Sequence, residues 1–101
     1  MRRGTYDLTI LDRPYVLRVG DEPKSGAGHS DIQHRVITAR ADYDDVLATV
    51  YHEVFEIICI QLGYVYTDYE ASRFFILPHR DMDSVTAVLA ASIRSLKRRT
   101  K

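Results

Sequence analysis

The chain has 101 residues, of which 46% are hydrophobic and 28% are charged, and its 14 basic side chains balance its 14 acidic ones. A chain of this length forms one domain with a small hydrophobic core. The balance of charge excludes a global field that would draw the protein to nucleic acid or to a membrane. The single cysteine, Cys59, excludes an internal disulfide framework.

The N-terminus and the lengths of the hydrophobic runs indicate the compartment. Arg2 and Arg3 follow Met1, but the apolar stretch of a signal peptide does not come after them. The apolar runs are all shorter than the roughly 20 residues that a membrane-spanning helix needs. We therefore expect a cytoplasmic protein with no membrane partner.

Residues 1–40 predict strands and a mobile loop. Apolar and polar side chains alternate over residues 5–11, which is the period of a half-buried strand, and a turn at Pro14 leads to a second strand over 15–19. Glycine and proline are frequent in residues 20–30, which predicts the loop. Residues 35–39 predict a third short strand.

The periodicity becomes helical after residue 41. Aspartates such as Asp45 suit the N-terminus of a helix, which we predict within residues 42–62, and Gly63 suits its end. Residues 72–77 predict a fourth strand, and apolar residues spaced by three and four predict a second helix within 79–97. The sequence thus predicts an α+β fold over 1–101, with a small three- or four-stranded sheet packed against two helices.

His52, Glu53 and Glu56 stand in the first predicted helix, which is apolar on nearly all sides. Such a helix is buried nearly all round, so we expect these ionisable groups in surroundings where an unpaired charge is costly. A wet cleft or an arginine, such as Arg35 or Arg40, would compensate them. A divalent metal ion is the alternative.

The spacing of these residues favours the metal ion. His52 and Glu56 are neighbours on one helical face because they are four positions apart. In the HExxH pattern, two histidines bind zinc from such a face, and the glutamate after the first histidine takes a proton from a water molecule on the metal. Here Glu53 is that glutamate and Glu56 replaces the second histidine, and glutamate is also a zinc ligand.

A catalytic zinc site needs a third protein ligand. We predict His79, because it follows Pro78 at the start of the second helix, where the returning chain could meet the first helix. His29 in the glycine-rich loop and His34 before a strand are rival histidines. The carboxylate alternatives are Asp68, Glu70, Asp81 and Asp83.

The segment Thr49-Val50-Tyr51-His52-Glu53-Val54-Phe55-Glu56-Ile57-Ile58 resembles the zinc helix of small zincin-like metallopeptidases. Among these are short phage and bacterial relatives of the SprT and ImmA/IrrE type proteins. The resemblance covers residues 35–96 and implies a minimal zincin-like fold. It further implies zinc as cofactor, the ligands His52, Glu56 and His79, the general base Glu53, and a peptide or protein substrate lying along an edge strand at residues 36–39.

Three functional hypotheses follow. The first is a zinc-dependent metallopeptidase in which Glu53 activates a metal-bound water. Most active zincins have histidine where Glu56 stands, and a second anionic ligand weakens the acidification of that water, so the second hypothesis is a non-catalytic zincin-like accessory or interaction module. The third, which the balanced charge disfavours, is a nucleic-acid-binding domain that uses the basic residues Arg94, Lys97, Arg98, Arg99 and Lys101. The metal could also be iron, nickel or manganese, which accept the same ligands.

Overall fold

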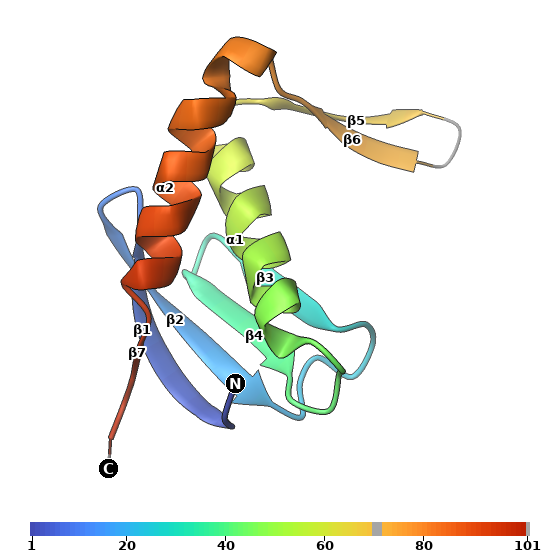
Figure 1. Ribbon diagram of the computed structural model, residues 1–101. Helices are drawn as coiled ribbons and strands as arrows, with labels where there is room; N and C mark the ends of the chain where they lie inside the picture. The colour runs from blue at the N-terminus through green and yellow to red at the C-terminus, as the bar shows by residue number, and fades with distance from the viewer. Residues whose placement is uncertain (70–71, 101) are drawn as a thin grey trace.

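The computed structural model describes residues 1–69 and 72–100, with the backbone alone for 65–69 and 72–76. Figure 1 shows two helices lying side by side over a sheet. In chain order the elements are β1 (Gly4–Ile10), β2 (Arg13–Gly20), β3 (Gly28–Asp31), β4 (Val36–Arg40), α1 (Val46–Gln61), β5 (Val65–Tyr69), β6 (Ser72–Ile76), the 3-10 helix η1 (His79–Asp81), α2 (Met82–Arg94) and β7 (Lys97–Arg98).

The main sheet has five strands in the order β3-β4-β2-β1-β7. β2 and β4 run parallel, and the other neighbouring pairs run antiparallel. The predicted α+β class is confirmed, but the predicted number of three or four strands is wrong. Two segments that were not predicted as strands account for the difference: Gly28–Asp31 pairs with β4, and Lys97–Arg98 pairs with β1.

β5 and β6 form a separate antiparallel hairpin. The strand that we predicted over residues 72–77 is therefore β6, but it pairs with β5 and does not join the main sheet. The hairpin projects beyond the C-terminal end of α1, away from the main sheet (Figure 1).

The hydrophobic core lies between the two helices and one face of the main sheet. Every second residue of β1 and β2 faces this core, as the alternation in the sequence predicted. The fully buried core side chains include Ile10, Leu17, Ile37, Val50, Val54, Ile57 and Val85.

Helix α1 begins where its N-cap is satisfied, because the Asp45 carboxylate accepts a hydrogen bond of 2.9 Å from the backbone N–H of Ala48. It ends before Gly63, whose φ of +80° is the left-handed conformation expected after a helix. The expectation that this helix is buried on nearly all sides is wrong. One face packs on the sheet and on α2, and the exposed large hydrophobic residues of the outer face and C-terminal end are Leu47, Tyr51, Ile60 and Leu62.

Helix α2 covers less of the chain than the predicted 79–97, because the chain turns after Arg94. The Ser95 side chain accepts a hydrogen bond of 2.8 Å from the backbone N–H of Thr9, which draws the following residues along β1 as β7. His79 to Asp81 form the short helix η1 instead of the first turn of α2. Among the described residues, neither α1 nor α2 is long and apolar enough to cross a membrane.

Gly28 lies where β3 comes close to α1, so an added side-chain atom at this position tests the contact. A Cβ atom at Gly28 would lie 2.6 Å from Thr49 Cγ2, whereas one at Gly20 would meet no atom within 4 Å. We expect Gly28→Ala to lower the free energy of unfolding by roughly 1–3 kcal/mol through overpacking, and the control Gly20→Ala to have little effect. Urea denaturation measures both, and equal stabilities would contradict the close approach.

Candidate metal centre

His52, Glu53 and Glu56 come together on α1, as their spacing predicted. Each side chain offers one ligand atom, and these three atoms all lie within 4.8 Å of one another. His52 Nε2 and Glu56 Oε2 are 3.1 Å apart across one turn of the helix. The described part of the chain therefore holds one cluster with the donor types of a divalent metal site.

The separation of His52 from Glu56 suits a shared metal ion. Two atoms bonded to one tetrahedral zinc ion at about 2.0–2.1 Å lie roughly 3.3 Å from each other. The 3.1 Å between His52 Nε2 and Glu56 Oε2 is close to this value. An imidazole nitrogen and a carboxylate oxygen are both accepted zinc ligands, so the residues present fit the ion.

The three side chains differ strongly in burial. The His52 side chain is 70% exposed and that of Glu56 is 25% exposed. Glu53 is only 6% exposed, because it lies on the side of α1 that faces the sheet. The sequence predicts an energetic cost of burying charge for all three groups. In the structure this cost applies mainly to Glu53, which is the buried one.

The surroundings of Glu53 make its ionised form unfavourable. Burial raises the pKa of its carboxyl group, and the neighbouring negative charge of Glu56 raises that pKa further. His52 and a hydrogen bond of 3.3 Å donated by Ser30 Oγ lower the pKa again, but the net shift is upward. A cation at His52 and Glu56 would offset this unfavourable charge. A carboxylate with a raised pKa in a solvent-accessible cluster is also typical of a general base.

Sequence reasoning missed the contribution of β3 to this cluster. Ser30 and Gly28 both face α1, since alternate residues of a strand share one side, yet they stand in the segment that we predicted as a mobile loop. The four residues Gly28–Asp31 carry no apolar alternation that would identify a strand. Only the pairing with β4 reveals it.

A pocket of about 400 Å³ lies beside the cluster. One wall comes from Ala27 and Gly28 and the other from α1, and the pocket is lined by Ala27, Gly28, Ala48, Thr49, His52 and Glu53. The side chains other than those of His52 and Glu53 are small, so they leave room for water or for a ligand next to the two ionisable groups.

His79 is not a member of the cluster. It is exposed at the start of η1, and its role as third ligand stays a prediction. His34 is exposed and binds Asp31, with 2.8 Å between His34 Nδ1 and a carboxylate oxygen. His29 is exposed on β3 and alternates with Gly28 and Ser30, so it points away from α1.

The carboxylate alternatives lie elsewhere. Burial raises the pKa of the Tyr64 phenol, and the neighbouring Asp81 raises that pKa further. Asp83 is exposed in the first turn of α2. The Asp68 side chain and Glu70 lie outside the described residues. Arg40, which we had considered as a partner for the glutamates, binds Asp42 instead.

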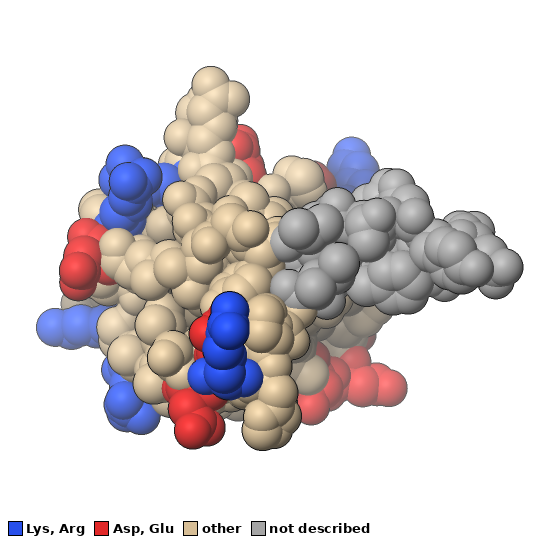
Figure 2. Space-filling model, turned by 90° about the horizontal axis from the view of Figure 1, so that it is seen from above, with Lys and Arg blue, Asp and Glu red and all other residues tan. Residues whose placement is uncertain are grey.

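Two arginines of the basic C-terminal segment bind residues in or next to β1. Arg99 binds the Asp7 carboxylate with two nitrogens, the shortest distance being 2.7 Å, and Arg98 donates a hydrogen bond to the backbone oxygen of Arg3. Lys101 lies outside the described residues. Viewed from above, Lys and Arg residues are interspersed with Asp and Glu residues on the part of this face that is not grey (Figure 2).

Comparison of the chain with models of known protein families gives no match, and comparisons with curated proteins and with solved structures give none either. The resemblance to zincins therefore rests on His52-Glu53-x-x-Glu56 and its place in a helix. The cluster is consistent with that motif.

The raised pKa of Glu53 predicts how substitution of this residue changes the stability of the metal-free protein with pH. Because the pKa is raised in the fold, ionised Glu53 opposes folding once the pH exceeds the value in the unfolded chain. Glu53→Gln should therefore raise the free energy of unfolding at pH 7 by on the order of 1 kcal/mol, with a smaller gain near pH 4, where the carboxyl group is mostly protonated in both states. Thermal unfolding with a chelator present measures this, and an equal gain at both pH values would contradict it.

Proposed function

We propose that this protein binds a divalent metal ion, zinc in the first place, at His52 and Glu56 and uses it to hydrolyse peptide bonds, with Glu53 as general base. The observation that carries the proposal is the approach of His52 Nε2 to within 3.1 Å of Glu56 Oε2, next to the buried carboxylate of Glu53. His79 is the proposed third ligand, from η1.

Each residue has a distinct part in this proposal. When bound, zinc would acidify water and polarise a carbonyl group. The His52 imidazole and the Glu56 carboxylate would hold the ion from adjacent turns of α1. Glu53 would accept a proton from water, because its carboxylate lies beside the two ligands and lines the pocket. Ser30 would fix the orientation of the Glu53 carboxylate through its hydrogen bond.

The openness of the cluster supports catalysis over a purely structural role. Structural zinc sites are closed by four protein ligands, whereas catalytic sites keep a position open. The His52 side chain is largely exposed, and the pocket lined by Gly28 and Glu53 gives access to the cluster. These features leave space for water and for a substrate.

A peptide or protein substrate would lie along β3. We had assigned the edge of the sheet to residues 36–39, but these belong to β4, which pairs with β3 on one side and β2 on the other. β3 ends the strand order, so it is the edge strand next to α1. An extended peptide adds to such an edge through backbone hydrogen bonds.

The metal-binding part predicts loss of zinc affinity on ligand substitution. We expect the metal-free protein to bind about one zinc ion, and His52→Ala and Glu56→Ala each to weaken binding by at least roughly 100-fold, because each removes a direct ligand. Substitution of a residue that only orients a metal ligand lowers metal affinity by the same amount at most, and usually by less. Isothermal titration calorimetry measures the affinity. His34→Ala is the control, since it removes an exposed histidine that pairs with Asp31. Equal affinity in all variants would refute the site, and His79→Ala tests the third ligand in the same assay.

The catalytic part predicts that Glu53→Gln keeps zinc but loses hydrolysis. Glutamine occupies nearly the same volume and cannot accept the proton, so we expect zinc affinity to change little and cleavage of a fluorogenic peptide library to fall by at least about 100-fold. Loss of zinc in Glu53→Gln would make Glu53 a ligand instead of the base. A zinc-loaded wild-type protein that cleaves nothing would instead support the non-catalytic accessory module.

A further inference from the structure

The two walls of the pocket beside Glu53 come from separate segments of the chain. Ala27 and Gly28 lie at the start of β3, after the connection from β2, whereas Thr49 and His52 lie on α1, after the turn from β4. The distance between these walls decides whether β3 reaches Glu53. Contacts that join the two connections therefore control the geometry of the cluster.

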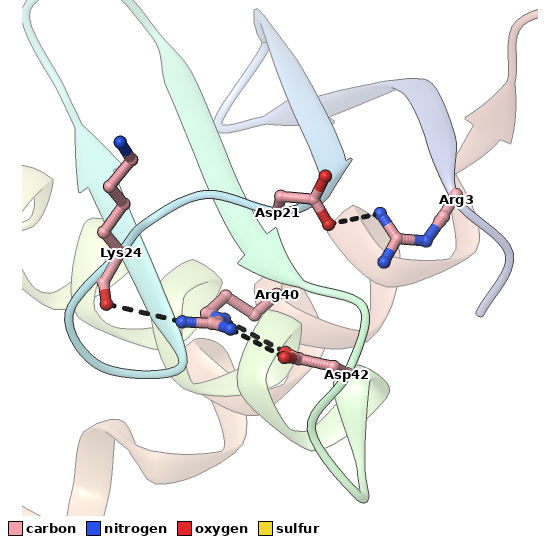
Figure 3. Close-up of polar contacts among 5 residues, drawn as sticks. All are labelled: Arg3, Asp21, Lys24, Arg40 and Asp42. Atoms are coloured by element: carbon pink, nitrogen blue, oxygen red, sulfur yellow. Dashed lines mark hydrogen bonds and ion pairs between the residues drawn. The ribbon is translucent and has the colours of Figure 1, made fainter.

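Arg40, the last residue of β4, holds the connection that leads into β3. Its backbone N–H donates a hydrogen bond of 2.8 Å to the oxygen of Ala27, and its Nη1 donates one of 3.3 Å to the oxygen of Lys24 (Figure 3). The loop before Gly28 is thus fixed both by the backbone and by the side chain of one residue.

The same guanidinium holds the turn that leads into α1. Nε and Nη2 bind the two oxygens of the Asp42 carboxylate at 3.0 and 2.6 Å, and the group lies 5.8 Å from the centre of the Tyr43 ring. The Arg40 side chain is only 26% exposed. Two parallel charge-assisted hydrogen bonds of this kind fix an orientation that a lysine ammonium group cannot reproduce.

The contacts between β3 and α1 tolerate little displacement. The hydrogen bond from Ser30 Oγ to Glu53 Oε2 is already 3.3 Å long, and such bonds weaken quickly beyond this length. A Cβ atom at Gly28 would lie 3.4 Å from Glu53 Cγ, so the backbone of β3 is packed directly on the glutamate. A small outward movement of β3 would release Glu53.

We propose that Arg40 is a positioning residue of the candidate metal centre, which joins the loop before β3 to the turn before α1 and so keeps Ser30 and Gly28 against Glu53. Its effect on hydrolysis rests on the proposed function; its effect on β3 does not. Arg40 lies outside the lining of the pocket and acts through Lys24 and Asp42.

The chain offers a matched control for this role. Arg99 binds Asp7 with the same two-nitrogen geometry, but it does so at the opposite edge of the sheet, beside β1 and β7. Substitution of Arg99 removes an ion pair of the same geometry, although a more exposed one, without touching β3 or α1.

The experiment compares Arg40→Lys and Arg40→Gln with Arg99→Lys and Arg99→Gln, and adds Asp42→Asn, which breaks the same bridge from its other end. Backbone hydrogen exchange of β3 in the metal-free protein and cleavage of the peptide library by the zinc-loaded protein are the two measurements. We expect the β3 amides to exchange about tenfold faster in the Arg40 and Asp42 variants, and peptide cleavage to fall about tenfold, because the base Glu53 loses its contacts with β3. Arg40→Lys should not restore either property, and the Arg99 variants should match the wild type.

Equal rates of β3 exchange in the Arg40 and Arg99 variants would overturn the proposal. Faster exchange spread evenly over the whole chain would also overturn it, because that result would indicate a general loss of stability. If the wild-type protein binds no zinc, the proposed function fails, and the exchange of β3 alone decides the role of Arg40. Peptide cleavage that falls in the Arg40 variants without any change in β3 exchange would also contradict the proposed mechanism.

Discussion

The burial of Glu53 between α1 and β3 is the constraint on which the candidate site depends. Its carboxyl group is among the few polar groups buried in the described structure, and burial together with Glu56 raises its pKa. Ser30 supplies one hydrogen bond, which offsets part of the cost. A cation bound at His52 and Glu56 would offset more of this cost.

The fold could be predicted from the sequence where local patterns decide the structure. The alternation in β1 and β2 and the aspartate cap of α1 led to the correct elements. β3 and β7 were missed because their residues carry no local strand signal and become strands only through partners distant in sequence, β4 and β1. Pairing across the chain, which one sequence does not show, therefore accounts for the missing strands.

The candidate site was likewise predictable where local sequence spacing decides the geometry, and not where distant segments meet. The helical spacing of His52 and Glu56 was sufficient to place them together, because four positions make one turn. The burial argument was right for Glu53 and wrong for its neighbours, since hydrophobic residues such as Tyr51 are exposed on the outer face of α1. Ser30 could not be identified, because its contact with Glu53 depends on the position of β3. Arg40, which the sequence offered as a charge partner of the glutamates, instead connects the segments around them.

The central claim is that His52 and Glu56 bind one metal ion beside Glu53. A crystal structure of the wild-type protein grown with zinc, with anomalous data collected at the zinc absorption edge, tests this claim most directly. Our account predicts an anomalous peak at about 2.0–2.2 Å from His52 Nε2 and from a Glu56 carboxylate oxygen, with the Glu53 carboxylate facing the ion. Zinc found only at other residues, or density at His52 and Glu56 without an anomalous signal at saturating zinc, would contradict it.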